Sequence, residues 1–322
     1  MDSVVVRKVW KENLVEEFEL VKVALRSHRT VSIDTEFPGV VYRPANVDGH
    51  DLGKLPPNWN YQVIRDNVNS TNIIQLGLAL CDDKGCLPDF GTECQYVWEF
   101  NFKDFDVYND LQNPESIELL ERQGIDFDKN LKEGIESADF AALILESGLL
   151  GNHHSAFTWV TFHGAYDIAH LMKILIRRPL PYDLTEFMIM VQSIFGKRLF
   201  DLKHMMKFCD GLYGGLEKVA NALGVQRLAG KSHQAGSDTL LTLQTFKKFL
   251  DVYFKEQNNG GLGVRHNGHL LTKMQLNLNI AGLKMINPHQ LNSAGLKMIY
   301  PFSHGFHVIN LNLCRQTSAI CN

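Results

Sequence analysis

Two acidic residues stand one position apart in the segment Val31–Gly39, which reads VSIDTEFPG and is apolar on both sides of the acids. The β-rich composition predicts a strand, and on a strand Asp34 and Glu36 point to the same face. Two carboxylates that close repel each other, and burial of either is costly without a compensating cation. A solvated strand is the simpler interpretation of such a pair. The apolar neighbours favour a metal-binding strand instead.

Two further acids and a histidine follow later in the chain. Asp167 lies between the apolar run TWVTF and the helical run IAHLMKIL, and Asp238 opens a long apolar helix with His233 five residues before it. Taken singly, Asp167 is explained as a helix N-cap, Asp238 as an acid that complements the helix dipole, and His233 as a polar loop residue.

Taken together with the pair on the strand, these residues form the inventory for phosphodiester hydrolysis by two metal ions. Hard oxygen ligands hold two Mg²⁺ or Mn²⁺ ions about 3.5–4 Å apart, where one activates water and the other stabilises the leaving oxygen. A histidine close to the water is a suitable base near neutral pH, which is the role that we predict for His233.

The elements that must position these residues alternate between strands and helices. A three-strand meander is predicted from the acidic strand and the apolar runs 73–81 and 95–102, with a long loop at 43–61. The remaining pattern predicts a strand at 158–162, a short strand at 198–201, and helices at 9–28, 115–148 in pieces that end at glycines, 168–175, 183–195, 202–209, 215–224 and 239–255.

Composition limits the possible classes of protein. The 322 residues are 45% hydrophobic and carry a net charge of −4, so nucleic-acid binding requires a local basic region or metal ions. No stretch approaches the roughly 20 apolar residues of a membrane span, and the first residues lack a secretory pattern. The six cysteines favour reduced thiols in an intracellular protein, and only Cys81, Cys86 and Cys94 form a weak metal candidate.

The chain changes character near residue 258. NNGGLG resembles a linker, residues 267–322 contain no Asp or Glu, and AGLKMINPH at 281–289 recurs as AGLKMIYPF at 294–302. We therefore predict a single globular domain at 1–257, followed by a linker and C-terminal tail at 258–322 whose order composition does not determine.

The motifs resemble the DEDD superfamily of 3′→5′ exonucleases with a His-x4-Asp third motif. More narrowly, the sequence resembles the deadenylase family of CCR-associated factors, the Caf/Pop-type nuclease subunits of the Ccr–Not complex. The resemblance covers about residues 5–257, and its most specific phrases are DTEFPGVV at 34–41, FHGAYDIAHLMKIL at 162–175 and HQAGSDTLLTLQTF at 233–246. The loop at 43–61 is longer than expected for this family, and the tail has no counterpart in it.

The resemblance implies an RNase H-like α/β fold, with a central mixed sheet flanked by helices. It also implies a metal-dependent exoribonuclease that shortens the poly(A) tails of mRNA and releases 5′-AMP. By carry-over, Asp34 bridges both metal ions, Glu36 and Asp238 complete the water-activating site, Asp167 completes the other, and His233 orients and deprotonates the water.

Two flanking residues are candidates for the terminal nucleotide, namely Phe37 and His163. Packing or a supporting hydrogen bond explains either residue equally well.

The implied partners are poly(A) RNA, a Not-type scaffold subunit and a second deadenylase, and the implied location is the cytoplasm and nucleus. The alternative hypothesis is an adaptor subunit that bridges another deadenylase to the Not scaffold. A DEDD exonuclease acting on DNA or structured RNA is the third. The filled catalytic positions favour the enzyme.

Overall fold

The computed structural model describes residues 3–45, 55–150, 156–209, 211–254, 296–302 and 305–311. The chain divides into two compact units, Met1–Lys284 and Met285–Asn322. The domain boundary that we predicted at residue 257 lies outside the described residues.

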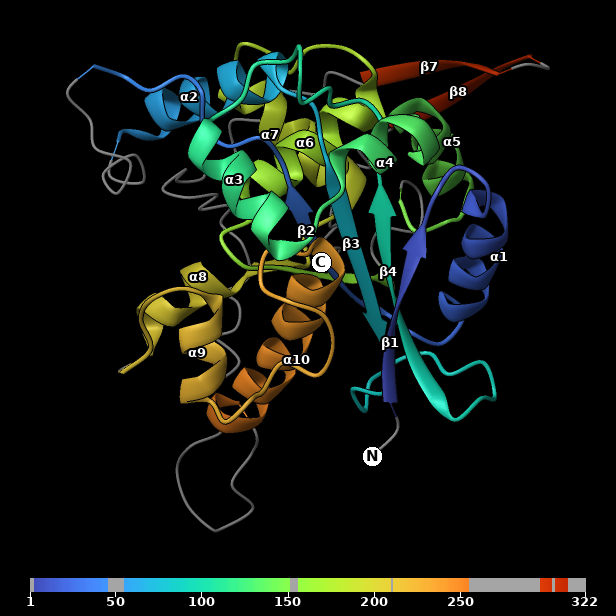
Figure 1. Ribbon diagram of the computed structural model, residues 1–322, viewed down its shortest axis with the longest axis vertical. Helices are drawn as coiled ribbons and strands as arrows, with labels where there is room; N and C mark the ends of the chain where they lie inside the picture. Colours follow the sequence, from blue (N-terminus) through green and yellow to red (C-terminus); the bar gives the residue numbers. More distant parts are fainter. Residues whose placement is uncertain are drawn as a thin grey trace, which may run out of the picture. The chain divides into compact units, whose positions relative to one another are not determined.

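A six-stranded mixed sheet forms the centre of the first unit, with the strand order β1-β4-β3-β2-β5-β6. Figure 1 shows β1, β4, β3 and β2 side by side in this sheet. The pairs β2–β3 and β3–β4 are antiparallel, which confirms the predicted meander, whereas the other three pairs are parallel. The strands are β1 Ser3–Val9, β2 Thr30–Glu36, β3 Gln75–Cys81, β4 Cys94–Asn101, β5 Thr158–Thr161 and β6 Leu199–Asp201.

Helices cover both faces of this sheet. None of the described helices is long and apolar enough to cross a membrane. The helices are α1 Leu14–Ala24, α2 Pro57–Ser70, α3 Pro114–Gln123, α4 Phe127–Glu133, α5 Ser137–Glu146, α6 Ala165–Ile176, α7 Leu184–Phe195, α8 Leu202–Met205, α9 Leu216–Ala222 and α10 Ala235–Tyr253, with a 3₁₀ turn at Met206–Phe208.

The core is built from the alternating side chains of the central strands. On one face, α10 packs Leu240 and Leu243 against Val97 of β4. On the opposite face, Phe100 of β4 contacts Phe18 of α1 and Phe140 of α5, with ring centroids 5.4 and 5.0 Å apart. Successive strand residues point to opposite faces, so Val97 and Phe100, three positions apart on β4, face these two different helix layers. The neighbouring strand β3 is buried along its whole length because helices cover both of its faces.

Two elements of the first unit differ from the sequence prediction. The predicted helix at 9–28 is shorter, since α1 spans Leu14–Ala24, and the strand β1 precedes it. The loop predicted at 43–61 ends early, because α2 begins at Pro57, where the missing N–H of proline is tolerated at a helix start. Residues 46–54 of that loop are not described.

The described part of the second unit is a β-hairpin. Strands β7, Leu296–Phe302, and β8, Gly305–Leu311, pair antiparallel along their whole lengths. The second copy of the AGLKM repeat therefore enters a strand, whereas the first copy lies outside the described residues.

Candidate active site

The acidic strand β2 lies at the centre of the sheet, where α10 approaches it closely. Asp34 pairs across the sheet with Gly77 of β3. A Cβ atom at Gly77 would overlap the carbonyl oxygen of Ala235, the first residue of α10. Glycine at this position therefore allows the first turn of α10, which carries Asp238, to lie against the strand.

Three of the predicted site residues come together at this point. Glu36, His233 and Asp238 each offer a ligand atom, and these atoms lie within 4.8 Å of one another. It is the only group of three or more potential metal-binding side chains in the described part of the chain. Cys81, Cys86 and Cys94, the weak candidate, do not form such a group.

Asp34 and Glu36 belong to one electrostatic cluster with the other two acids. Burial raises the pKa of the Asp34 carboxyl well above its usual value, and the neighbouring carboxylates Asp167, Asp238 and Glu36 raise it further. Burial likewise raises the pKa of Glu36, with additional repulsion from Asp238 and Asp167. The four acids therefore require positive charge to be ionised together.

Asp167 is held by the backbone and side chain of the strand that carries the first two acids. The amide N–H and the hydroxyl of Thr35 both donate to its Oδ1, at 2.7 and 2.6 Å. The N-cap of α6 is Gly164 and has no side-chain capping bond, so Asp167 is not the cap of this helix. Burial raises the pKa of Asp167 to about 7, although the bonds from Thr35 oppose this shift.

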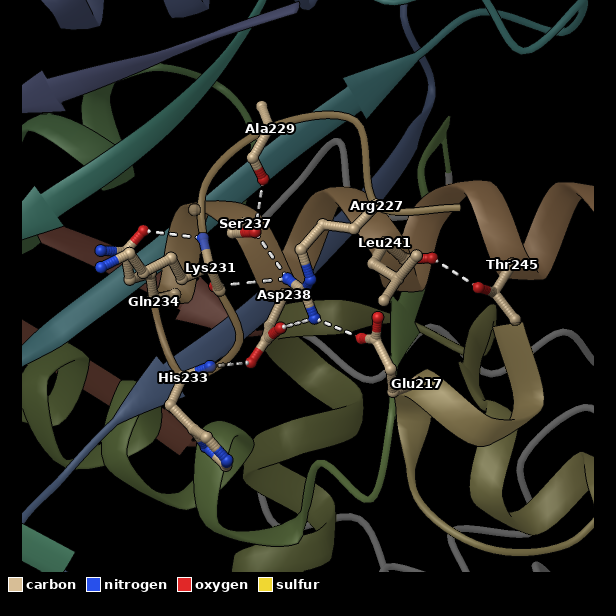
Figure 2. Close-up of polar contacts among 12 residues, drawn as sticks. Glu217, Arg227, Ala229, Lys231, His233, Gln234, Ser237, Asp238, Leu241 and Thr245 are labelled. Atoms are coloured by element: carbon tan, nitrogen blue, oxygen red, sulfur yellow. Dashed lines mark hydrogen bonds and ion pairs between the residues drawn. The ribbon is translucent and has the colours of Figure 1, made fainter. Parts of the chain in front are cut away.

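Both carboxylate oxygens of Asp238 have partners (Figure 2). Oδ1 lies 2.6 Å from the guanidinium of Arg227, and Oδ2 accepts a hydrogen bond from the backbone N–H of His233 at 2.8 Å. The same guanidinium lies 2.7 Å from Glu217, and only 13% of the Arg227 side chain is exposed. Arg227 was not predicted, because no local pattern marks an arginine in this loop as the partner of a distant helical acid.

His233 occupies a left-handed backbone conformation with φ of +58°, and its imidazole is exposed beside the carboxylates. The loop before it is closed by the Lys231 N–H, which donates to the Gln234 side chain at 3.0 Å. This geometry leaves a ring nitrogen accessible to a water molecule at the carboxylate cluster.

The two candidates for nucleotide contact have different surroundings. The ring of Phe37 stacks on Tyr166 at 5.1 Å and lies 5.0 Å from His170, so it packs against the helix that carries Asp167. His163 is exposed at the turn between β5 and α6, with φ of +62°. Contact of either residue with a nucleotide stays a prediction.

The donor set fits divalent metal ions that prefer oxygen. The donor set contains four carboxylates and a single histidine, which are hard ligands, and burial raises the pKa of three of the carboxyls, those of Asp34, Glu36 and Asp167. No thiolate belongs to the described group. Arg227 forms an ion pair with one of the four acids, Asp238, and shares its charge with Glu217 outside the cluster. The remaining repulsion is what bound cations would relieve.

A central mixed sheet flanked by helices, with acids on its middle strand, defines an RNase H-like fold with a candidate nuclease site. A family model for the CAF1 family ribonucleases matches residues 9–142. The poly(A) ribonuclease pop2 of Schizosaccharomyces pombe is 43% identical over 249 residues, covering 77% of this chain and 70% of the relative. The chain belongs to the CAF1 ribonuclease family.

Solved structures agree with this assignment. The S. pombe Pop2p structure in its Mg²⁺- and Mn²⁺-bound form has a TM-score of 0.70 and 41% identity, and the match covers 79% of this chain and 95% of that chain. A yeast structure of the NOT1 MIF4G domain co-crystallised with CAF1 has a TM-score of 0.61 and 32% identity, covering 77% and 89%. Both identities are high enough to support family membership as well as the fold.

Proposed function

We propose that this protein is a poly(A)-specific 3′→5′ exoribonuclease that shortens mRNA tails and releases 5′-AMP. The observation that carries the proposal is the convergence of Glu36, His233 and Asp238 within 4.8 Å, beside Asp34, in a chain of the CAF1 ribonuclease family. The S. pombe relative that is 43% identical over 249 residues is named a poly(A) ribonuclease.

In the proposed reaction, a water oxygen forms a bond to phosphorus, the P–O3′ bond to the preceding nucleotide breaks, and the released O3′ takes up a proton from solvent to become the new 3′-hydroxyl. An imidazole nitrogen of His233 accepts the proton of the attacking water. Asp238 remains aligned because Arg227 and the His233 N–H hold its two oxygens, and Thr35 fixes one oxygen of Asp167.

Divalent ions such as Mg²⁺ or Mn²⁺ would be held by four acids. The resemblance implies Asp34 for both sites, Glu36 and Asp238 for the water-activating site, and Asp167 for the other. When bound, they supply water activation and stabilisation of the leaving oxygen. The metal-bound Pop2p relative is consistent with this cofactor choice.

The test measures degradation of oligo(A) with a free 3′ end, with and without Mg²⁺ or Mn²⁺. Degradation of a mixed-sequence RNA under the same conditions is the comparison. We expect shortening that depends on metal, and we expect Asp34→Ala to abolish it while the circular dichroism spectrum stays unchanged. Hydrolysis retained by Asp34→Ala would refute the assignment of the site. Competition with DNA and with structured RNA separates this function from a DEDD exonuclease of other specificity.

The adaptor hypothesis predicts binding of scaffold and deadenylase without hydrolysis. A yeast CAF1 was co-crystallised with a NOT1 MIF4G domain, and we propose a Not-type scaffold as a partner of this chain as well. We further propose a second deadenylase as a partner in the same assembly and a location in the cytoplasm and nucleus. Co-purification tests the partner, and cell fractionation tests the location. Truncation before residue 264 tests whether the tail contributes to hydrolysis or partner binding.

A further inference from the structure

A group of lysine and aromatic side chains lies outside the carboxylate cluster. One member directly follows β5, and the others lie on α8, on the 3₁₀ turn after it, and on the loop and first turns of α9. Figure 1 shows α8 and α9 beside α10. We call this group the α8–α9 surface: Phe162, Lys203, Lys207, Phe208, Tyr213 and Lys218.

A lysine ammonium group lies over two of the three aromatic rings of this surface. Lys218 Nζ is 3.8 Å from the ring centroid of Tyr213, and Lys203 Nζ is 5.7 Å from that of Phe162. The Tyr213 side chain is 65% exposed. Exposed rings that stack on bases, with ammonium groups placed for phosphates, are the components by which proteins hold single-stranded nucleic acid.

The charge of the surface is positive although the chain as a whole is not. Lys203, Lys207 and Lys218 contribute three cations. Glu217, the acid next to Lys218, lies 2.7 Å from the Arg227 guanidinium, which it shares with Asp238, so its charge is only partly offset. In a chain with a net charge of −4, such a local basic region is what attraction of a polyanion requires.

The surface is tied to the carboxylate cluster by the buried Asp201. Its Oδ2 accepts from the Gly164 N–H at 2.8 Å, and its Oδ1 accepts from the His204 N–H at 2.9 Å. Gly164 is the N-cap of the helix that carries Asp167, and His204 belongs to α8. One carboxylate therefore joins the start of the catalytic helix to the start of the basic surface.

The lysines of the surface also act electrostatically on His163, in the turn between β5 and α6. Desolvation lowers the pKa of His163, Asp201 opposes the shift, and the ammonium groups of Lys203 and Lys207 lower it further. These lysines therefore lie close to the turn that leads into Asp167.

We propose that the α8–α9 surface binds the single-stranded RNA that precedes the terminal nucleotide held at the carboxylate cluster. The inference rests on the proposed function, because the occupant is the substrate of the neighbouring site. Unpaired RNA fits better than a duplex, since only unstacked bases can lie on exposed rings such as Tyr213 and Phe208.

The test compares surface variants with matched controls elsewhere on the chain. The variants are Lys207→Gln combined with Lys218→Gln, and Tyr213→Ala. Lys132→Gln, an exposed lysine of α4, controls for charge. Tyr182→Ala controls for the aromatic ring, because Tyr182 is 73% exposed and lies under the Arg65 guanidinium at 4.4 Å.

Binding is measured by fluorescence anisotropy with oligo(A) of about 20 nucleotides over a salt series, in the Asp34→Ala background with Mg²⁺. The double lysine variant is expected to lose two phosphate contacts. Because each contact with a single strand contributes about 0.7 to the slope of log affinity against log salt, the slope should become shallower by about 1.4. Tyr213→Ala is expected to lower affinity roughly 10-fold. Without the Asp34→Ala change, both variants should lower kcat/KM for the long oligomer and leave a trinucleotide unaffected.

Affinity and salt slope equal to those of the unmodified surface would overturn the proposal. The proposal would also be overturned if the two control variants lost as much RNA affinity as the surface variants. The same holds if the surface variants lost binding to an acidic protein partner while their RNA binding stayed intact. If the unmodified chain binds RNA through these residues but hydrolyses nothing, the surface stands and the proposed function fails.

Discussion

Replacement of Glu36 by glutamine removes one negative charge from the cluster and keeps the shape of the side chain. The Glu36 side chain is buried, and its ligand oxygen lies within 4.8 Å of that of Asp238. At an effective dielectric constant near 20, two unit charges at this distance repel by about 3 kcal/mol. We expect Glu36→Gln to raise the free energy of unfolding in EDTA by up to this amount, which is roughly 6–12 °C in Tm.

The same substitution should damage function, because an amide is a weaker ligand for a divalent ion than a carboxylate. We expect a loss of at least about 100-fold in metal-dependent hydrolysis. Mg²⁺ should stabilise the unmodified protein, by about 2.7 kcal/mol at a concentration 100 times its Kd, and should stabilise the variant less. Opposite signs for stability and activity are the expected signature of a metal site.

The pH dependence of the stability gain follows from the raised pKa of Glu36. The unfolded chain releases this proton near the usual value of 4.5, whereas the folded protein retains it to a higher pH because of burial and its acidic neighbours. Without metal, the protein therefore loses stability as pH rises above 4.5, until the folded pKa is passed. Glu36→Gln lacks this loss, so its advantage should be absent near pH 4 and grow toward pH 8.

Thermal denaturation in EDTA and in Mg²⁺ at about pH 5 and pH 8 measures these effects, together with hydrolysis of oligo(A). Glu19→Gln is the control, since Glu19 is exposed and pairs with Lys22 at 2.7 Å, and it should change stability by less than about 1 kcal/mol. A Glu36→Gln variant that is less stable than the unmodified protein in EDTA at about pH 8 would refute the repulsion argument.

Three further substitutions test the site and its support. Burial lowers the pKa of His170 to about 3, so below pH 6.5 the unfolded chain binds a proton that the folded protein does not, and the protein loses stability. His170→Phe removes this loss. Relative to the unmodified protein, its free energy of unfolding in urea should therefore be about 3 kcal/mol higher at pH 4 than at pH 7.5. Arg227→Met leaves Asp238 without its ion pair and should lower the free energy of unfolding in EDTA by about 3 kcal/mol, and by less in Mg²⁺. Gly77→Ala should cost about 1–3 kcal/mol and reduce hydrolysis, since its methyl group displaces Ala235 at the start of α10.

Each of these substitutions has an outcome that contradicts its reasoning. Parallel stability curves for His170→Phe and the unmodified protein across this pH range would show that the histidine does not titrate on unfolding. A loss for Arg227→Met that is equal in EDTA and Mg²⁺ would show that its charge is not what matters. Gly215→Ala is the control for Gly77→Ala, because a Cβ atom there has no neighbour within 4 Å.

Much of the secondary structure could be predicted because its signals are local. The apolar runs of β3 and β4 and the long apolar helix α10 are visible in the sequence, since each buries most of its side chains. Strand β1 was missed because it alternates exposed and half-buried residues, with only Val9 fully buried. Helix α2 was missed because asparagine and proline dominate its beginning, and its buried Tyr61 and Ile64 give a weak pattern.

The sequence by itself determined which residue types are available for chemistry and that Asp34 and Glu36 share a face of one strand, because that spacing is a property of the strand alone. Only the tertiary structure decided that Thr35 donates to Asp167, 132 positions away, and that Arg227 pairs with Asp238. Such contacts depend on the strand order and on the close approach of α10 at Gly77, which no local pattern encodes.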